Sequence, residues 1–350
     1  MTLFNIAQRF PLPDRKGKPI NIEGRRLLDQ HGKDHSSRPA DLTSIVLLSA
    51  ERGEFTQACI ESLFRHTEEP FEVIISDVGS SEETINILHS FEDAYPNLTV
   101  IYNTQSRGTG GQRNQAVLLS RGRYVVFMDN DVLALPSWLS ALKEEANRDP
   151  NTALVGAKLL KKEQEFVYYC GLHAISLEKE GKVYGIGLDK EGEKGSLHQD
   201  DERVNIKGIV PWYPTTTLLA RRETLLEFGG FDDWDGTRGI MLANEDKDLS
   251  LTARKYGYKI IYTSHSEVIH AHEYHKVDRT NRYHRLYRLR NDLIEKDILY
   301  LMKKWKLEYM LEKLPHEDNT RRFEKGRLTP VKLDLTSGPL AADVRRIEPL

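Results

Sequence analysis

The run YVVFMDNDV at residues 124–132 constrains the fold more than any other stretch, because a strand-like segment leads directly into two acidic residues. Residues 124–128 are apolar or aromatic and favour β-structure, so we expect a buried strand that ends at Asp129. In an open parallel sheet, ligands bind beyond the carboxyl ends of the strands. The sequence therefore predicts that Asp129 and Asp131 stand at the solvent-facing mouth of a cleft.

The spacing of these two acids suggests a metal site. Residues two apart on an extended chain point the same way, so Asp129 and Asp131 can converge on one hard cation or one ligand. Two carboxylates supply too few oxygens to enclose a metal, and Mg²⁺ or Mn²⁺ commonly completes its shell with water and substrate phosphates. The pattern predicts Mn²⁺ or Mg²⁺ used with a nucleotide diphosphate. The alternative is a strand followed by an ordinary Asp/Asn turn, the more frequent meaning of an isolated D-x-D pattern.

Strand-like and helix-like segments alternate on both sides of this run. We expect strands at 44–49, 72–76, 98–102, 124–128, 153–160, 215–220, 259–262 and 267–270. We expect helices at 55–64, 80–91, 110–120, 136–148, 221–228 and 244–256, with one or two more within 283–311. This order predicts an α/β fold with a mostly parallel central sheet, helices on its faces and a C-terminal helical extension.

The second half of the chain adds further candidates. The predicted helix at 244–256 has Glu245, Asp246 and Asp248 in its first turn. A favourable interaction with the helix dipole is enough to explain one acid in this turn, but it explains three less well. His270 and His272 share a face of a predicted strand, and we weigh metal ligation against an exposed histidine-rich turn.

Composition narrows the class of protein. The 350 residues are 39% hydrophobic and carry a formal net charge of -3, which gives no argument for nucleic-acid binding. No apolar run approaches the roughly 20 residues of a membrane span, and the first residues lack the apolar centre of a secretory signal. We expect a cytoplasmic protein with reduced cysteines. Alternatively, the predicted helix within 283–311 lies on a membrane surface. We therefore include the inner membrane surface, as a peripheral contact, among the expected partners.

Five segments together resemble the family 2 glycosyltransferases of the GT-A fold, which is Rossmann-like. They occupy residues 44–48, 72–81, 110–131, 229–232 and 244–262, and the likeness extends over about 43–305. The resemblance implies inverting transfer of one sugar from a nucleotide-sugar donor, with a UDP-sugar as first choice. The implied acceptor is a glycan, lipid-linked or protein hydroxyl in cell-surface polysaccharide or glycoconjugate synthesis. No Q-x-x-R-W follows Glu245 and Asp246, so we expect single transfers rather than polymer extrusion.

The resemblance also implies roles for individual residues. The expected contacts to the donor nucleotide are Ala50, Glu51, Asp77, Gly111, Arg113, Asp129 and Asn130. The expected metal ligands are Asp131, Asp129, His270 and His272. Asp246 is the expected catalytic base, with Glu245 beside it. The turn after the first strand departs from the family, which usually has a proline there, whereas this chain has Ser49, Ala50 and Glu51.

The same reading divides the chain into four parts. Residues 1–42 form an N-terminal arm, and 43–275 form the transferase domain, with a nucleotide-binding half at 43–135 and an acceptor half at 136–275. The C-terminal helices occupy 276–314, and the tail at 315–350 is extended or disordered. Within the acceptor half, 161–209 has little periodicity and is treated as a variable excursion.

Two other functions fit parts of the sequence. A sugar-phosphate nucleotidyltransferase also uses an α/β domain with acid-bound Mg²⁺, but it needs a phosphate-binding loop rich in Gly and Arg after the first strand. Residues 49–53, SAERG, match such a loop poorly. A catalytically silent domain that only binds a nucleotide sugar is the other alternative, and the joint presence of Asp129, Asp131 and Asp246 argues against it.

Overall fold

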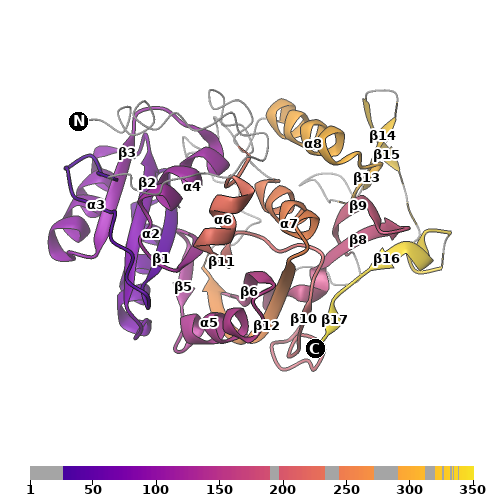
Figure 1. The fold of residues 1–350 in the computed structure, drawn as a ribbon, viewed down its shortest axis with the longest axis horizontal. Coiled ribbons are helices and arrows are strands. Elements are labelled where there is room, and N and C mark those ends of the chain that lie inside the picture. The colour runs from indigo at the N-terminus through magenta and orange to yellow at the C-terminus, as the bar shows by residue number, and fades with distance from the viewer. Residues whose placement is uncertain are drawn as a thin grey trace.

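A computed structural model describes residues 27–189, 197–232, 244–271, 291–311, 320–324, 327–331, 333, 335–337 and 339–350. These residues form two β-sheets with helices packed around the larger one (Figure 1). The N-terminal strands lie at one end of the view and the smaller sheet lies at the other.

The first half of the chain alternates between strands and helices, as the sequence predicts. Its elements are β1 (Thr43–Ser49), α2 (Gly53–His66), β2 (Phe71–Val78), α3 (Glu82–Ala94), β3 (Leu98–Asn103), α4 (Gly108–Leu119), β4 (Tyr124–Asp129), β5 (Val132–Ala134), α5 (Trp138–Arg148) and β6 (Thr152–Lys161). Helix α2 buries one apolar face, with Cys59, Ile60 and Leu63 fully buried, whereas α4 is buried all round.

The later elements complete this sheet. They are β7 (Val167–Tyr169), β10 (Lys207–Ile209), β11 (Thr217–Arg221), α6 (Arg222–Phe228), α7 (Glu245–Lys255), β12 (Lys259–His270) and β17 (Glu348–Pro349). The strand order is β17-β10-β12-β6-β11-β4-β1-β2-β3. Strands β1 to β4 pair in parallel, as do β6 and β12, whereas β11 runs antiparallel between β4 and β6. The sheet is therefore mostly parallel, and the predicted fold class is confirmed.

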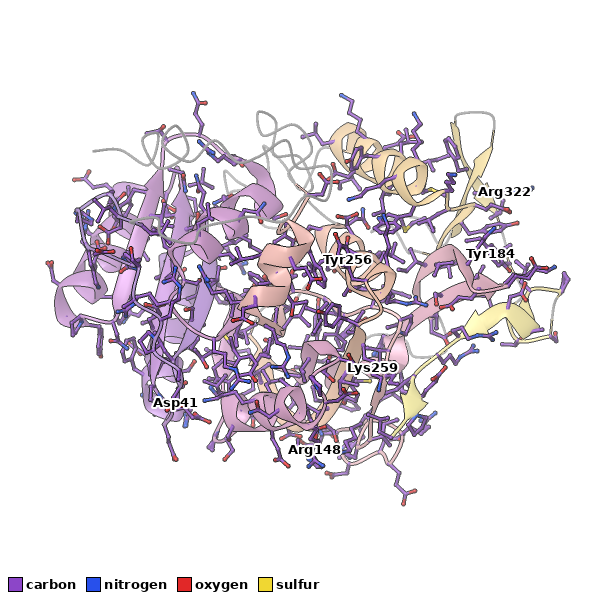
Figure 2. The ribbon with its side chains drawn as sticks, viewed as in Figure 1. Asp41, Arg148, Tyr184, Tyr256, Lys259 and Arg322 are labelled. Carbon is purple, nitrogen blue, oxygen red and sulfur yellow. The ribbon has the colours of Figure 1, made fainter. Side chains whose placement is uncertain are left out.

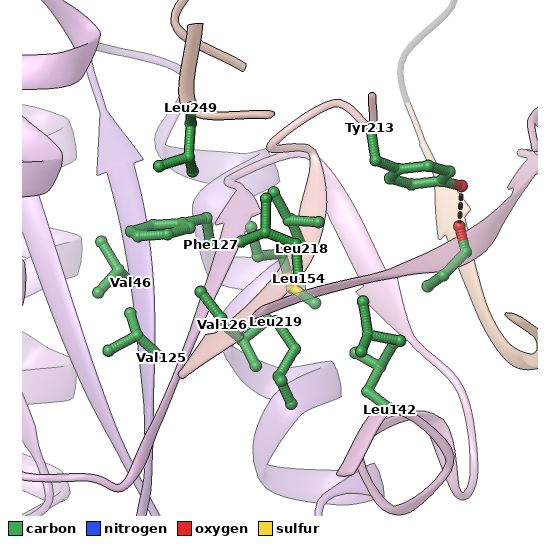
Figure 3. Close-up of a cluster of buried hydrophobic side chains, with 14 of the residues drawn as sticks. Val46, Val125, Val126, Phe127, Leu142, Leu154, Tyr213, Leu218, Leu219 and Leu249 are labelled. Atoms are coloured by element: carbon green, nitrogen blue, oxygen red, sulfur yellow. Dashed lines mark hydrogen bonds between the residues drawn. The ribbon is translucent and has the colours of Figure 1, made fainter. Parts of the chain in front are cut away.

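The core lies where β4, β11 and β6 meet (Figure 3). Phe127 of β4 is fully buried and packs edge-on against Phe231, with ring centroids 4.9 Å apart. The Tyr213 ring fills the space over Gly156 of β6, where a Cβ would lie 2.1 Å from the ring. A side chain at position 156 would therefore displace Tyr213, whose hydroxyl donates to the Ala157 carbonyl oxygen.

The smaller sheet differs from the sequence-based expectation. Its order is β15-β14-β13-β9-β8-β16, built from β8 (Ala174–Lys179), β9 (Lys182–Leu188), β13 (Tyr309–Leu311), β14 (Thr320–Glu324), β15 (Arg327–Val331) and β16 (Val344–Arg345). Short helical turns at Gly171–His173 and Ala341–Asp343 lie beside it. Tyr184 of β9 and Arg322 of β14 lie on this part of the molecule (Figure 2). The excursion at 161–209 and the described parts of the tail thus form paired strands rather than loose chain.

The described part of the N-terminal arm is also packed. Leu27 is 1% exposed, and the side-chain amide of Gln30 donates to the Val100 carbonyl oxygen and accepts from the Tyr102 amide of β3. The imidazole of His35 lies 3.0 Å from the Asp29 carboxylate, and both side chains are buried. The described part of the arm, residues 27–42, therefore covers the edge of the sheet at β3.

Two further elements differ in extent. The predicted strands at 259–262 and 267–270 are one strand, β12, with a register shift between Thr263 and Glu267. Such an irregularity interrupts the side-chain alternation that the sequence pattern relies on. The predicted helical stretch 283–311 contains α8 (Asn291–Trp305), and residues 283–290 lie outside the described residues.

Candidate active site

Asp129 and Asp131 lie at the carboxyl end of β4, as predicted, but in different environments. The Asp129 side chain is 34% exposed, whereas that of Asp131 is 8% exposed. The Nη1 atom of Arg52 lies 3.0 Å from Asp131 Oδ2. The expectation that Asp131 faces solvent is wrong, because the guanidinium of Arg52 covers it. Removing the Asp131 carboxylate would leave a largely buried arginine without this partner.

His270 reaches the two acids through strand pairing. It ends β12, pairs with Val132 of β5, and the next residue donates its amide to the Asp131 carbonyl oxygen. This register brings His270 Nε2 to 3.7 Å from Asp131 Oδ1. The imidazole is stacked on the Tyr168 ring, with centroids 4.2 Å apart and planes 10° apart. His272, the other candidate ligand, lies outside the described residues.

These three side chains fit a divalent cation. Asp129, Asp131 and His270 each offer one ligand atom, and these atoms lie within 4.8 Å of one another. Two ligand atoms that are each about 2.1 Å from an ion can be at most about 4 Å apart, and the separation of 3.7 Å between His270 and Asp131 meets this limit. A pair near the 4.8 Å bound would have to move closer together when an ion binds. Carboxylate oxygen and imidazole nitrogen suit Mn²⁺ and are compatible with Mg²⁺ when oxygen ligands complete the shell.

Arg113 of α4 connects this cluster with α7. Its Nη1 atom lies 2.5 Å from Glu245 Oε1, and its Nη2 atom lies 3.6 Å from Asp129 Oδ1. The Arg113 side chain is 4% exposed and packs over the Phe231 ring. Its guanidinium is therefore bound to carboxylates of the protein, and its expected contact with a nucleotide stays a prediction. Glu245 Oε2 is buried and has no hydrogen-bond partner among the described residues.

The three acids at the start of α7 point in different directions. The Asp246 side chain is 16% exposed, and its Oδ1 atom accepts a hydrogen bond from the Lys247 amide. The Asp248 carboxylate is buried against α8, where it accepts hydrogen bonds from Lys304 Nζ and Trp305 Nε1. Burial raises the pKa of Asp248, and Lys304 opposes this rise. Of the three carboxylates, that of Asp246 is the most exposed.

The turns after β1 and β2 are joined through side chains. Asp77 is buried near the end of β2, and burial raises its pKa, against the hydrogen bond from Ser80. The Ser80 hydroxyl donates to Asp77 Oδ1 over 2.5 Å and accepts from the Glu51 amide over 2.7 Å. The Glu51 carboxylate in turn accepts from the Ser81 amide. Glu51 and Asp77, both predicted to contact the nucleotide, therefore belong to one network.

The remaining predicted contacts lie on the elements that border the cluster. Gly111 is buried within α4, and Asn130 donates its side-chain amide to the Thr56 hydroxyl of α2 over 2.7 Å. Ala50 precedes Glu51 in the turn after β1. Their roles toward a nucleotide stay predictions.

Sequence reasoning missed two groups beside the acids, namely Arg52 and Tyr168. Arg52 follows β1 by three positions, in a turn where no periodic pattern assigns a direction to side chains. Tyr168 belongs to β7, a strand of three residues in the region taken as an excursion. The order of motifs could have suggested Arg52, because the turn after the first strand leads to the same edge of the sheet as Asp131.

One finding concerns membranes. None of the described helices is long and apolar enough to cross a bilayer.

Comparison with known proteins relates part of the chain to one family. Residues 44–202 match Glycosyl transferase family 2. The chain is 25% identical over 232 residues to the glucosyl-dolichyl phosphate glucuronosyltransferase of Haloferax volcanii, covering 65% of this chain and 67% of that protein. It is 25% identical over 254 residues to the N-acetylglucosaminyl-diphospho-decaprenol L-rhamnosyltransferase of Mycobacterium tuberculosis, covering 69% of this chain and 78% of that protein. The match to this chain covers 28%, 17% and 36% of the length of three other curated relatives.

A solved structure gives the fold. The crystal structure of GalNAc-T7 with UDP, GalNAc and Mn²⁺ superposes with a TM-score of 0.50 at 15% identity, covering 67% of this chain and 44% of that chain. The chain therefore has the GT-A fold, and its residues 44–202 resemble glycosyl transferase family 2.

Proposed function

We propose that this chain transfers one sugar from a nucleotide-diphosphate sugar to an acceptor hydroxyl, with inversion at the anomeric carbon. The observation that carries the proposal is the convergence of Asp129, Asp131 and His270 at the carboxyl edge of a family 2 domain. Arg113 contacts both Asp129 and Glu245, so the start of α7 borders this cluster. A place for the donor and a place for a base thus lie on adjoining elements.

The chemistry needs two functions from these residues. Departure of a nucleoside diphosphate places negative charge on its oxygens, which a divalent cation bound at this site would offset. Asp129, Asp131 and His270 would hold that cation. The acceptor hydroxyl must lose a proton as it attacks the anomeric carbon, and the Asp246 carboxylate would accept it. A single displacement of this kind inverts the configuration of the sugar.

The acceptor we propose is a sugar linked to a lipid phosphate or diphosphate. Two relatives, the glucuronosyltransferase and the rhamnosyltransferase, have names that specify a dolichyl phosphate and a diphospho-decaprenol substrate. GalNAc-T7, which shares the fold, was crystallised with UDP and Mn²⁺, so we take this pair as the first probe. The donor sugar then has to come from a screen.

The turn after β1 argues against a nucleotidyltransferase. A phosphate loop needs backbone amides that point freely at the ligand. Here the Glu51 amide donates to Ser80 Oγ, and the Glu51 carboxylate takes the Ser81 amide. The Glu51 amide of this turn is thus occupied by a side chain of the protein, which supports the transferase over this alternative.

The test is to incubate the purified protein with a panel of nucleotide sugars, Mn²⁺ and a lipid-diphosphate-linked acceptor, and to separate the products by chromatography. We expect acceptor-dependent release of a nucleoside diphosphate from at least one donor. Release of pyrophosphate from a nucleoside triphosphate and a sugar phosphate would instead identify a nucleotidyltransferase. Binding of nucleotide sugars without release from any donor would identify a silent binding domain.

Two variants assign the activity to this site. Asp131→Asn keeps the size of the side chain but removes the charge, and we expect it to abolish release. Asp93→Asn removes one charge from an exposed position on α3 and should behave as wild type. Equal activity of the two variants would place the reaction elsewhere.

A further inference from the structure

Arg52, a described residue that the mechanism above does not use, contacts one of the proposed cation ligands. Its Nη1 atom lies 3.0 Å from Asp131 Oδ2, and its guanidinium packs over the Phe55 ring at 4.4 Å. The side chain is 14% exposed. Arg52 is therefore held against one carboxylate oxygen, while the other, Oδ1, lies 3.7 Å from His270 Nε2.

The backbone fixes this position. Glu51 and Arg52 both have left-handed conformations, with φ values of 65° and 64°. Two consecutive residues other than glycine in this region are unfavourable and persist only where surrounding contacts hold them. Two hydrogen bonds of Glu51 hold the turn. The Glu51 amide donates to the Ser80 hydroxyl, and the Glu51 carboxylate accepts from the Ser81 amide. The turn thus aims Arg52 at Asp131 with a geometry set by the loop after β2.

Two arginines already contact the acids of the cluster, and one of them, Arg113, is shared with Glu245. Arg52 lies against Asp131, and Arg113 lies 3.6 Å from Asp129. A lone divalent cation entering between Asp129, Asp131 and His270 would share a carboxylate with Arg52 in a site that is mostly shielded from water. Like charges at such distances repel strongly where the effective dielectric constant is low. A diphosphate changes this balance, because its oxygens can bind the cation and the guanidinium at the same time.

We propose that Arg52 makes cation binding conditional on the nucleoside diphosphate. The guanidinium occupies the Asp131 carboxylate, so a cation that arrives alone binds weakly. When cation and diphosphate are both bound, the guanidinium moves to the diphosphate. Cation and nucleotide therefore bind with positive coupling, and by reciprocity each tightens the other by the same factor. This inference rests on the proposed function, since it uses the same cation site and the same donor.

The experiment measures binding of Mn²⁺ without any turnover. Free Mn²⁺ is followed by its electron paramagnetic resonance signal as protein is titrated, with and without UDP and with a blank for the complex of Mn²⁺ and UDP. The proteins are wild type, Arg52→Gln, Arg52→Lys and Arg65→Gln, the last being an exposed arginine of helix α2, which begins directly after Arg52. Circular dichroism and thermal melting verify that each variant is folded.

We expect wild type to bind Mn²⁺ at least about 10-fold more tightly when UDP is present, the size of a typical coupling between two sites. Arg52→Gln should bind Mn²⁺ alone about 10-fold or more tightly than wild type, and its coupling with UDP should shrink by the same factor. Arg52→Lys keeps the charge and should stay close to wild type, as should Arg65→Gln.

Three results would overturn the inference. If Arg52→Gln binds Mn²⁺ alone no more tightly than wild type, or more weakly, Arg52 only orients Asp131. If its coupling with UDP is unchanged, another group links the two ligands. In both cases the proposed function stands, because Mn²⁺ still binds. If wild type and all variants fail to bind Mn²⁺ even with UDP, the proposed cation site is refuted and this inference falls with it.

Discussion

Arg113 and Glu245, 132 residues apart in the sequence, form a buried ion pair in which Nη1 and Oε1 are 2.5 Å apart. The pair joins α4, which borders the expected donor site, to the start of α7, which carries the proposed base. Asn114, next in α4, clamps the turn at Phe231 by donating to its carbonyl oxygen and accepting from its amide. Two adjacent residues of α4 thus position the elements of the proposed acceptor side.

The first prediction concerns the stability of this connection. Arg113→Met leaves the Glu245 carboxylate buried without its cation, and removal of one partner of a buried pair typically costs about 3–5 kcal/mol. We expect a loss of this size in the free energy of unfolding, measured by urea denaturation. Adding Glu245→Leu should restore much of the loss, because the double variant buries no unpaired charge. A single variant as stable as wild type would show that the pair is not desolvated in solution.

The second prediction concerns Lys304 of α8, which bridges two carboxylates. Its Nζ atom lies 2.5 Å from Asp232 Oδ2 and 2.8 Å from Asp248 Oδ1. Burial lowers the pKa of Lys304, but the two carboxylates outweigh burial and raise the pKa above 10.5. A lysine whose pKa is raised by folding contributes its full stabilisation at pH values below the pKa that the same lysine has in the unfolded chain. That stability is lost as pH rises through the pKa of the folded protein.

Lys304→Met should therefore lower the free energy of unfolding at pH 8 by about 1.5–3 kcal/mol, the range for hydrogen bonds to charged groups. The difference from wild type should shrink as pH rises above the value of 10.5 that applies to an ordinary lysine. Denaturation curves at several pH values measure both effects. Lys303→Met, at an exposed neighbouring position, is the control. A difference that does not depend on pH would mean that Lys304 acts through packing rather than charge.

The third prediction separates chemistry from binding at α7. Asp246→Asn keeps the size and polarity of the side chain but removes the proton acceptor. We expect kcat to fall by about 10²–10⁴, the range for loss of a general base, with little change in nucleotide affinity. Steady-state kinetics and calorimetric titration with UDP measure the two quantities.

Asp248→Asn is the comparison for this experiment. Its carboxylate binds Lys304 and Trp305 of α8, so we expect lower stability as the main effect. If Asp246→Asn turns over at the wild-type rate while Asp248→Asn is folded and inactive, the assignment of Asp246 as the base is wrong and Asp248 is the base.

The fold was predictable where burial imposes a period on the sequence. Residues 124–128 are apolar because β4 is covered on both faces, and the alternation of strands and helices follows from the same rule. The small sheet was not predictable in this way. Strand β16 has two residues and pairs with β8 through its backbone at Val344 and Leu177, a contact that leaves almost no side-chain pattern.

The candidate site was predictable to the extent that its residues end predicted strands. Asp129 and Asp131 follow β4, and His270 ends β12, so a motif and a strand boundary sufficed to name them. Arg52 and Asp131 are 79 residues apart, and their contact depends on a left-handed turn that no propensity foretells. Tyr168 and Lys304 likewise act through contacts between distant segments, which periodicity does not encode.

The most direct test of the whole account is a crystal structure of the protein with Mn²⁺ and UDP, in which anomalous scattering locates the ion. We predict Mn²⁺ within about 2.0–2.3 Å of His270 Nε2 and of carboxylate oxygens from Asp131 or Asp129, a range typical of divalent metals with nitrogen and oxygen ligands. UDP bound without an ion at these three residues, or an ion bound elsewhere with His270 pointing away, would contradict the proposed site.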